Sequence, residues 1–334
     1  MRRVSIPIYL DCDTGIDDAL ALGYLLARPD ADLVGIGTVS GNTSAAQAAR
    51  NTLDLLQLAG RSEVPVAVGA HDPVAGAYAG GSPHVHGENG IGDLAIPRAA
   101  AEPVAEDAAA MLTRLAHEHA GRLHVVAIGP LTNLALALTR DPDLADRVAH
   151  VTIMGGAALA PGNVTPVAEA NIHHDPEAAA QVVQAHWDIT LAPLDVTMAH
   201  RLTEAQVERL AATGRPFDRA LAAMADHYFG FYEPIFGVRV AALHDPLAAM
   251  LAVDGVVVGR APTLKVVVDD THGPGRGQTI VDTRRHYVDY HQQPRTRCRV
   301  VLSVETDVAE HLVETLVATD RTAARFTGSS QLRV

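Results

Sequence analysis

The sequence predicts an α/β fold with a mainly parallel sheet and helices on both of its faces. Short apolar runs alternate with helix-like segments along the chain, which is typical of such a sheet. The 334 residues, 48% hydrophobic and 19% charged, can also bury a large core. We see no internal repeat or linker, so we expect one domain over residues 1–334.

The N-terminal part alternates regularly between the two kinds of element. Apolar runs predict buried strands at residues 4–10, 31–42 and 64–70. Helices are expected between them, at residues 17–29, closed by Pro29, and at residues 43–60, ending at Gly60. This part therefore supplies three strands and two helices.

The same rhythm continues through the rest of the chain. Three apolar runs each lead into a turn or helix start, at residues 123–138, 148–157 and 188–197. Thr203 and Gln206 match a capping box, so a helix should begin there. We expect loops or loosely held helices at residues 76–97 and 228–242. The tail predicts strands at residues 263–270 and 298–307 and a last helix from about residue 308.

Composition argues against several classes of protein. The net charge of −13 is spread along the chain, which argues against nucleic acid as a partner. No apolar run reaches the roughly 20 residues of a membrane helix, and the first run is broken by Pro7, so we expect a cytoplasmic protein without membrane contact. Cys12 and Cys298 cannot form a disulfide scaffold, and we interpret them as inert buried thiols.

Four carboxylates crowd the end of the first predicted strand, in "DCDTGIDDALAL": Asp11, Asp13, Asp17 and Asp18. Ligands of open α/β sheets bind beyond the carboxyl ends of the strands, which is where these residues fall. Asp17 and Asp18 could serve as helix caps, but four buried acids repel one another and favour a bound cation. Without a nearby His or Cys pair, the ligands indicate Ca²⁺ or Mg²⁺ rather than zinc.

A second acidic site lies in "LHDPLAAM", where His244 and Asp245 precede an apolar run. As the start of a helix, Asp245 could be a simple cap. Beside a metal ion it could instead complete the coordination sphere, and the neighbouring histidine could supply an acid.

The chain resembles the nucleoside hydrolases of the inosine–uridine preferring type. The resemblance is carried, in this order, by "DCDTGIDDALAL", "SGN", "HGENGIGD", "AIGPLTNLALAL", "IMGGA", "GNVTPVAEANIHHDPEAA" and "LHDP". It implies a single α/β domain with a Rossmann-like sheet, its active site at the C-terminal strand ends, and a bound Ca²⁺. It also implies hydrolysis of the N-glycosidic bond of small-molecule ribonucleosides by a homodimer or homotetramer.

The resemblance also implies roles for the acidic residues. Asp13 matches a carboxylate that binds calcium and takes a proton from the attacking water. Asp18 and Asp245 match further calcium ligands, and Ile128 matches the position whose backbone carbonyl reaches the ion. We assign Asp11 a supporting role, in which it orients the backbone or the metal ligands.

The remaining matched positions surround the sugar and the base. Residues expected to bind the ribose are Asp17, Asn42, Met154, Asn163, Glu169 and Asn171. His244 and His86 match histidines near the leaving base, and we treat both as catalytic. This pair favours pyrimidine or broad specificity.

Several alternatives stay open. "IYLDCDTG" also resembles the strand-end motif of haloacid dehalogenase-like phosphatases, but Lys265, the only lysine, lies in what reads as one strand with Asp269 and Asp270. A non-catalytic nucleoside- or ribose-binding protein with structural calcium is a second alternative. His84 and His86 would face alike in an extended segment and form half of a zinc site. Aromatic residues at near-helical spacing favour core packing, with at least one lining the base site: Tyr228, Phe229, Tyr232 and Phe236.

Overall fold

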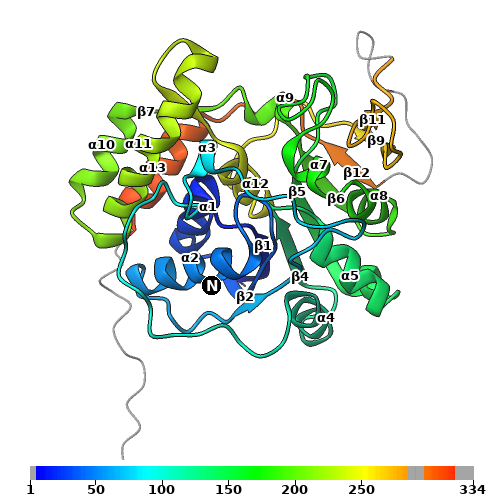
Figure 1. Ribbon diagram of the computed structural model, residues 1–334, viewed down its shortest axis with the longest axis horizontal. Helices are drawn as coiled ribbons and strands as arrows, with labels where there is room; N and C mark the ends of the chain where they lie inside the picture. The colour runs from blue at the N-terminus through cyan, green and yellow to red at the C-terminus, as the bar shows by residue number, and fades with distance from the viewer. Residues whose placement is uncertain (1–4, 285–289, 291–296, 320–334) are drawn as a thin grey trace, which may run out of the picture.

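A central eight-stranded sheet organises the computed structural model, within the residues that the structure describes, 5–284, 290 and 297–319 (Figure 1). The strand order is β3-β2-β1-β4-β5-β6-β12-β9, and every neighbouring pair is parallel except β12 with β9. The strands are β1 (Ile6–Cys12), β2 (Ala31–Thr38), β3 (Val66–Val68), β4 (Leu123–Ala127), β5 (Val148–Met154), β6 (Ile189–Ala192), β9 (Thr263–Leu264) and β12 (Cys298–Val300). The predicted fold class is confirmed.

Helices cover both faces of the sheet, because successive strand side chains point to opposite sides. Leu10 of β1 packs into one core, whereas its neighbour Tyr9 packs into the other. The first core includes α1 (Ile16–Ala27), α2 (Ala45–Leu58), α10 (Glu204–Ala212), α11 (Pro216–Phe236), α12 (His244–Ala252) and α13 (Val308–Ala318). The second includes α4 (Ala108–Glu118), α5 (Thr132–Arg140) and α8 (Pro176–Gln184). Figure 1 shows α10, α11 and α13 grouped on one side, with α4, α5 and α8 on the other.

Short elements fill the connections. They are α3 (Pro83–His86), α6 (Leu144–Arg147), α7 (Ala170–His174), α9 (Leu194–Thr197), β7 (Arg201–Thr203), β8 (Val240–Ala242), β10 (Val266–Val268) and β11 (Thr279–Val281). β7 pairs with β8 and β10 with β11, both antiparallel. The capping box predicted at Thr203 and Gln206 is present at the start of α10. Within the described part of the chain, no helix combines the length and apolarity needed to cross a bilayer.

The strand order reverses between β1 and β4, which creates a crevice at the carboxyl ends of these strands. Asp13 directly follows β1, and Asn42 follows β2. Ile128 comes after the last residue of β4, and Met154 ends β5. The sheet thus brings these four residues to one rim, as the sequence predicted.

Two expected elements differ in the structure. Residues 228–236, expected as a loop or a loosely held helix, form the firmly packed second half of the 21-residue helix α11, which ends where Gly237 adopts a left-handed φ of 68°. Burial of Tyr228, Phe229 and Tyr232 against the core stabilises this half of the helix. The single strand expected at residues 263–270 is also wrong. The chain leaves the main sheet at Lys265, so β9 pairs with β12 and β10 with β11, and Asp269 lies beyond both strands.

Candidate active site

A cavity of about 800 Å³ opens at the carboxyl end of the sheet. Its wall includes most of the residues predicted from the sequence: Asp17, Asn42, His86, Ile128, Met154, Asn163, Glu169, Asn171, His244 and Asp245. Asp13 and Asp18 are not part of the wall and are each only 1% exposed. Both connect to it through Asn42, whose backbone N–H donates to Asp13 and whose side-chain amide donates to Asp18. The fold therefore gathers all twelve predicted site residues in one region.

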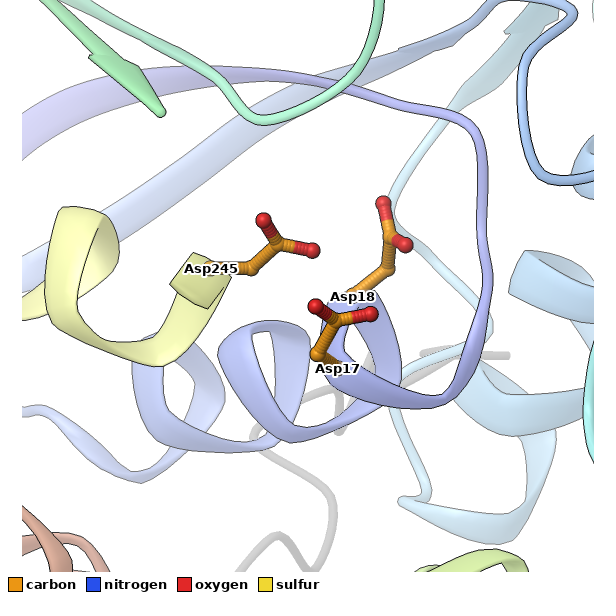
Figure 2. A group of neighbouring side chains, drawn as sticks. All are labelled: Asp17, Asp18 and Asp245. Carbon is orange, nitrogen blue, oxygen red and sulfur yellow. The ribbon is translucent and has the colours of Figure 1, made fainter. Parts of the chain in front are cut away.

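Three carboxylates converge at one end of this cavity. Asp17 and Asp18 lie in the first turn of α1, and Asp245 lies in the first turn of α12. Figure 2 shows the three side chains directed toward one another across the space between the two helices. One oxygen from each lies within 4.8 Å of the others, and all three residues are buried. This spacing lets one cation touch all three.

Asp13 is fixed beside this group by its surroundings. Its Oδ2 accepts a hydrogen bond from Asn42 N at 2.6 Å, and its own N–H donates to Asp18 Oδ1 at 3.2 Å. A Cβ at position 41 would stand 2.1 Å from Asp13 Oδ2, so only glycine allows the backbone to approach this closely. Among the described residues, Asp13 Oδ1 and Asp17 Oδ1 are buried without a hydrogen-bond partner.

Burial raises the pKa of every acid in the group. The pKa of Asp18 rises to about 7, chiefly through desolvation and then through the charge of Asp17. The pKa values of Asp13 and Asp245 rise well above the usual range for the same two reasons, burial first and neighbouring carboxylates second. A bound cation would offset both costs, and the unpartnered oxygens offer it ligands. The residues therefore fit a metal ion that prefers oxygen.

The predicted ribose-binding residues are held by backbone hydrogen bonds. Glu169 caps α7, accepting hydrogen bonds from Asn171 N at 2.9 Å and Ile172 N at 3.1 Å. Asn171 Nδ2 donates to the carbonyl oxygens of Ile128 at 2.9 Å and Met154 at 3.2 Å. These contacts tie α7 to the ends of β4 and β5, so the polar side chains face the cavity in fixed positions.

The two predicted histidines are neutral side chains in the cavity wall. His86 Nδ1 accepts a hydrogen bond from Ile16 N at 3.1 Å, and burial lowers the pKa of His86 to about 3. Burial also lowers the pKa of His244, whose two ring nitrogens lie 2.7 Å from the Tyr232 hydroxyl and 2.8 Å from Thr197 Oγ1.

The zinc alternative is not supported by the local geometry. Residues 83–86 form α3 rather than an extended segment, so His84 is exposed while His86 is buried. In the described ranges, neither histidine joins a group of three or more metal-ligating side chains.

Aromatic residues of α11 contribute more than core packing. Tyr228 and Tyr232 line the cavity, so aromatic residues of this segment reach it, and contact of one of them with the base stays a prediction. The Tyr228 hydroxyl donates to Asp17 Oδ2 at 3.0 Å. The spacing of the aromatic residues does not predict this hydrogen bond. It predicts that one face of the helix is buried, but not which group a tyrosine hydroxyl binds.

Two further supporting residues were missed in the sequence. Asn133, at the start of α5, donates from Nδ2 to Asp11 Oδ2 at 3.0 Å, and the Tyr9 hydroxyl donates to the same oxygen at 2.8 Å. Thr132 donates to Asp175, which also caps α8. The "GPLTN" turn, which contains Thr132 and Asn133, was visible in the sequence as a turn after a strand. The sequence does not show what these two residues bind, because their partners lie more than 40 residues away.

Comparisons with known proteins point to one family. The family model described as inosine-uridine preferring nucleoside hydrolase matches residues 8–311. Uridine nucleosidase 1 of Arabidopsis thaliana is 36% identical over 277 residues, covering 82% of this chain and 81% of that protein. The pyrimidine-specific ribonucleoside hydrolase RihA of Salmonella enteritidis is 37% identical over 244 residues, covering 73% and 78%. The structure of a purine-preferring ribonucleoside hydrolase from Gardnerella vaginalis is similar with a TM-score of 0.88, at 32% identity, covering 95% and 100%.

Proposed function

The chain belongs to the inosine-uridine preferring nucleoside hydrolases, and from that premise we propose a calcium-dependent ribonucleoside hydrolase in which Asp13 activates the attacking water. Hydrolysis of ribonucleosides follows from the family and from the named relatives. The observation that supports the finer proposal is the buried Asp13 Oδ1, unpartnered within the described residues and beside three converging carboxylates.

We assign each step of the reaction to particular residues of the chain. Asp13 takes a proton from water as the water oxygen forms its bond to C1′ of the ribose, and the electron pair of the C1′–N bond leaves with the base. Asp17 and Asn171 hold the 2′- and 3′-hydroxyls, and Asn163 and Glu169 lie near the 5′-hydroxyl. His244 and His86 stand at the departing base. The positive charge that develops on the ribose is stabilised by the surrounding carboxylates.

We propose Ca²⁺ as the resident metal, held by Asp13, Asp18, Asp245 and the Ile128 carbonyl. These are oxygen donors, which suit a hard cation of high coordination number. When bound, calcium supplies positive charge that favours ionisation of water, but less strongly than zinc does, so a carboxylate base is still required. Asp17 is an additional candidate ligand for the ion, because one of its carboxylate oxygens lies within 4.8 Å of an oxygen of Asp18 and of Asp245.

A substrate panel tests the activity. We expect uridine and cytidine to be hydrolysed at least as fast as inosine, adenosine and guanosine, because the uridine nucleosidase and RihA relatives carry pyrimidine names. Release of free base is measured for each nucleoside, with and without a calcium chelator. Activity should disappear with the chelator and return with added Ca²⁺. Turnover of none of the five would contradict the proposed function, and faster turnover of the purines would contradict the pyrimidine preference alone.

Removal of the 2′-hydroxyl tests the ribose contacts. We expect kcat/KM for 2′-deoxyuridine to be about 100-fold lower than for uridine, because Asp17 and Asn171 would lose a charge-assisted hydrogen bond. The comparison uses the two nucleosides under identical conditions, with 5′-deoxyuridine as a control for loss of a different hydroxyl. Equal kcat/KM for uridine and 2′-deoxyuridine would rule out this assignment.

The alternatives predict other results. A haloacid dehalogenase-like phosphatase would release phosphate from a phosphate ester, and a nucleoside-binding protein with structural calcium would bind without turnover. Neither is favoured by the relatives.

We also propose that the protein is a homodimer or homotetramer. Light scattering of the purified protein would measure its oligomeric state directly.

A further inference from the structure

His244 is held by two hydroxyl groups, one on each ring nitrogen. Nε2 lies 2.7 Å from the Tyr232 hydroxyl, and Nδ1 lies 2.8 Å from Thr197 Oγ1. Tyr232 and His244 line the cavity, whereas Thr197 is fully buried behind the ring. Each hydroxyl can donate or accept, so the direction of these two hydrogen bonds decides which nitrogen carries the proton.

The surroundings of Thr197 decide that direction. Across the residues that the structure describes, His244 Nδ1 is the only hydrogen-bond partner of Thr197 Oγ1. If Nδ1 carried the proton, the Thr197 hydroxyl would accept it, and its own O–H would be buried without an acceptor. If Thr197 donates to Nδ1 instead, both groups are satisfied. Donation by Thr197 is therefore the favoured arrangement, and it places the ring proton on Nε2.

The fold keeps Thr197 in this position. It is the last residue of α9, which begins two residues after β6, and His244 begins α12 after β8. Leu243 N donates to the His200 carbonyl at 3.0 Å, which ties the start of α12 to the chain just beyond α9. The contact between the two side chains thus joins two separate elements at the same end of the sheet.

We propose that Thr197 is a positioning residue that fixes His244 as the Nε2–H tautomer, and that this arrangement directs the Tyr232 hydroxyl proton toward the leaving base. With the proton on Nε2, His244 donates to the Tyr232 oxygen. The Tyr232 O–H is then not committed to His244, and it can donate to the neighbouring Tyr228 oxygen or to a group in the cavity. The base, which departs with the electron pair of the C1′–N bond, accepts this hydrogen bond. The inference rests on the proposed nucleoside hydrolase function and adds no covalent step to it.

Removal of the Thr197 hydroxyl tests the proposal. Thr197→Val keeps the shape of the side chain, and we expect kcat for uridine to fall about 10-fold with KM changed by less than about twofold, because only departure of the base is affected. Hydrolysis of p-nitrophenyl β-ribofuranoside should change by less than about twofold, since nitrophenolate departs without help. Thr197→Ser retains the donor and should keep kcat for uridine within about threefold of wild type.

Two kinetic results would overturn the proposal. One is an equal loss on both substrates, which indicates a merely structural role, and the other is unchanged kcat for uridine in Thr197→Val.

Nitrogen NMR of the wild-type protein, labelled at histidine, measures the tautomer of His244 directly and does not require a Thr197 variant to fold. The His244 signal is assigned by its absence in His244→Gln. We expect Nε2 to carry the proton, and a protonated Nδ1 would contradict the proposal. If wild-type protein hydrolysed neither substrate, the proposed function would fail, whereas the nitrogen spectrum would still determine the tautomer.

Discussion

Asp13→Asn should lower kcat for uridine roughly 10³- to 10⁴-fold, the largest effect we expect from one substitution. Asparagine has nearly the same shape, and its side-chain oxygen can still accept the hydrogen bond from Asn42 N. It cannot take a proton from water, and it is a weaker calcium ligand than a carboxylate. The measurement is single-turnover release of uracil with Ca²⁺ in excess.

A matched control exists two residues earlier, inside β1. Asp11 is equally buried, but both of its oxygens accept hydrogen bonds from Asn133 and one also from Tyr9, so neither is available to water. We expect Asp11→Asn to lower kcat by less than about 10-fold. Uridine binding by Asp13→Asn, measured by calorimetry, should persist. Turnover by Asp13→Asn close to wild type would show that another group is the base.

The fold was predictable because its signals are local. The apolar runs that became β1, β2 and β4, and the capping box at Thr203, depend on residues a few positions apart. The second half of α11 was expected as a loop or a loosely held helix because aromatic residues and glycine have modest helix propensity. What stabilises this half is burial of Tyr228 and Tyr232 against distant parts of the chain, which local sequence does not reveal.

The site was predictable only where its residues follow strand ends or match the family. Asp13 directly follows β1 and Asn42 lies in the loop after β2, so sheet topology alone brings them to one rim. The sequence does not reveal what Thr197 and Asn133 bind, because their partners lie 47 and 122 residues away. The hydroxyl of Tyr228 is similar, since helical spacing explains its burial but not its hydrogen bond to Asp17.

Removal of calcium should lower the melting temperature, and the loss should grow as the pH rises. A ligand present at 1,000 times its Kd stabilises the folded state by about 4 kcal/mol, which corresponds to roughly 6 °C in a chain of this size. Without a cation, the pKa of Asp18 is about 7 in the folded protein against 3.8 in the unfolded chain. The folded state then binds more protons between these values, so the free energy of unfolding of the calcium-free protein falls as the pH rises from about 4 to about 7.

Bound calcium removes this dependence, because it keeps the carboxylates ionised without requiring protons. The difference in melting temperature between calcium-loaded and chelated protein should therefore be small at pH 5 and largest at pH 8, as measured by scanning calorimetry. Asp18→Asn should show little response to the chelator at either pH, whereas Asp143→Asn, at an exposed position, should respond like wild type. An unchanged melting temperature at pH 8, in protein shown by mass spectrometry to be metal-free, would mean that the converging carboxylates hold no stabilising cation.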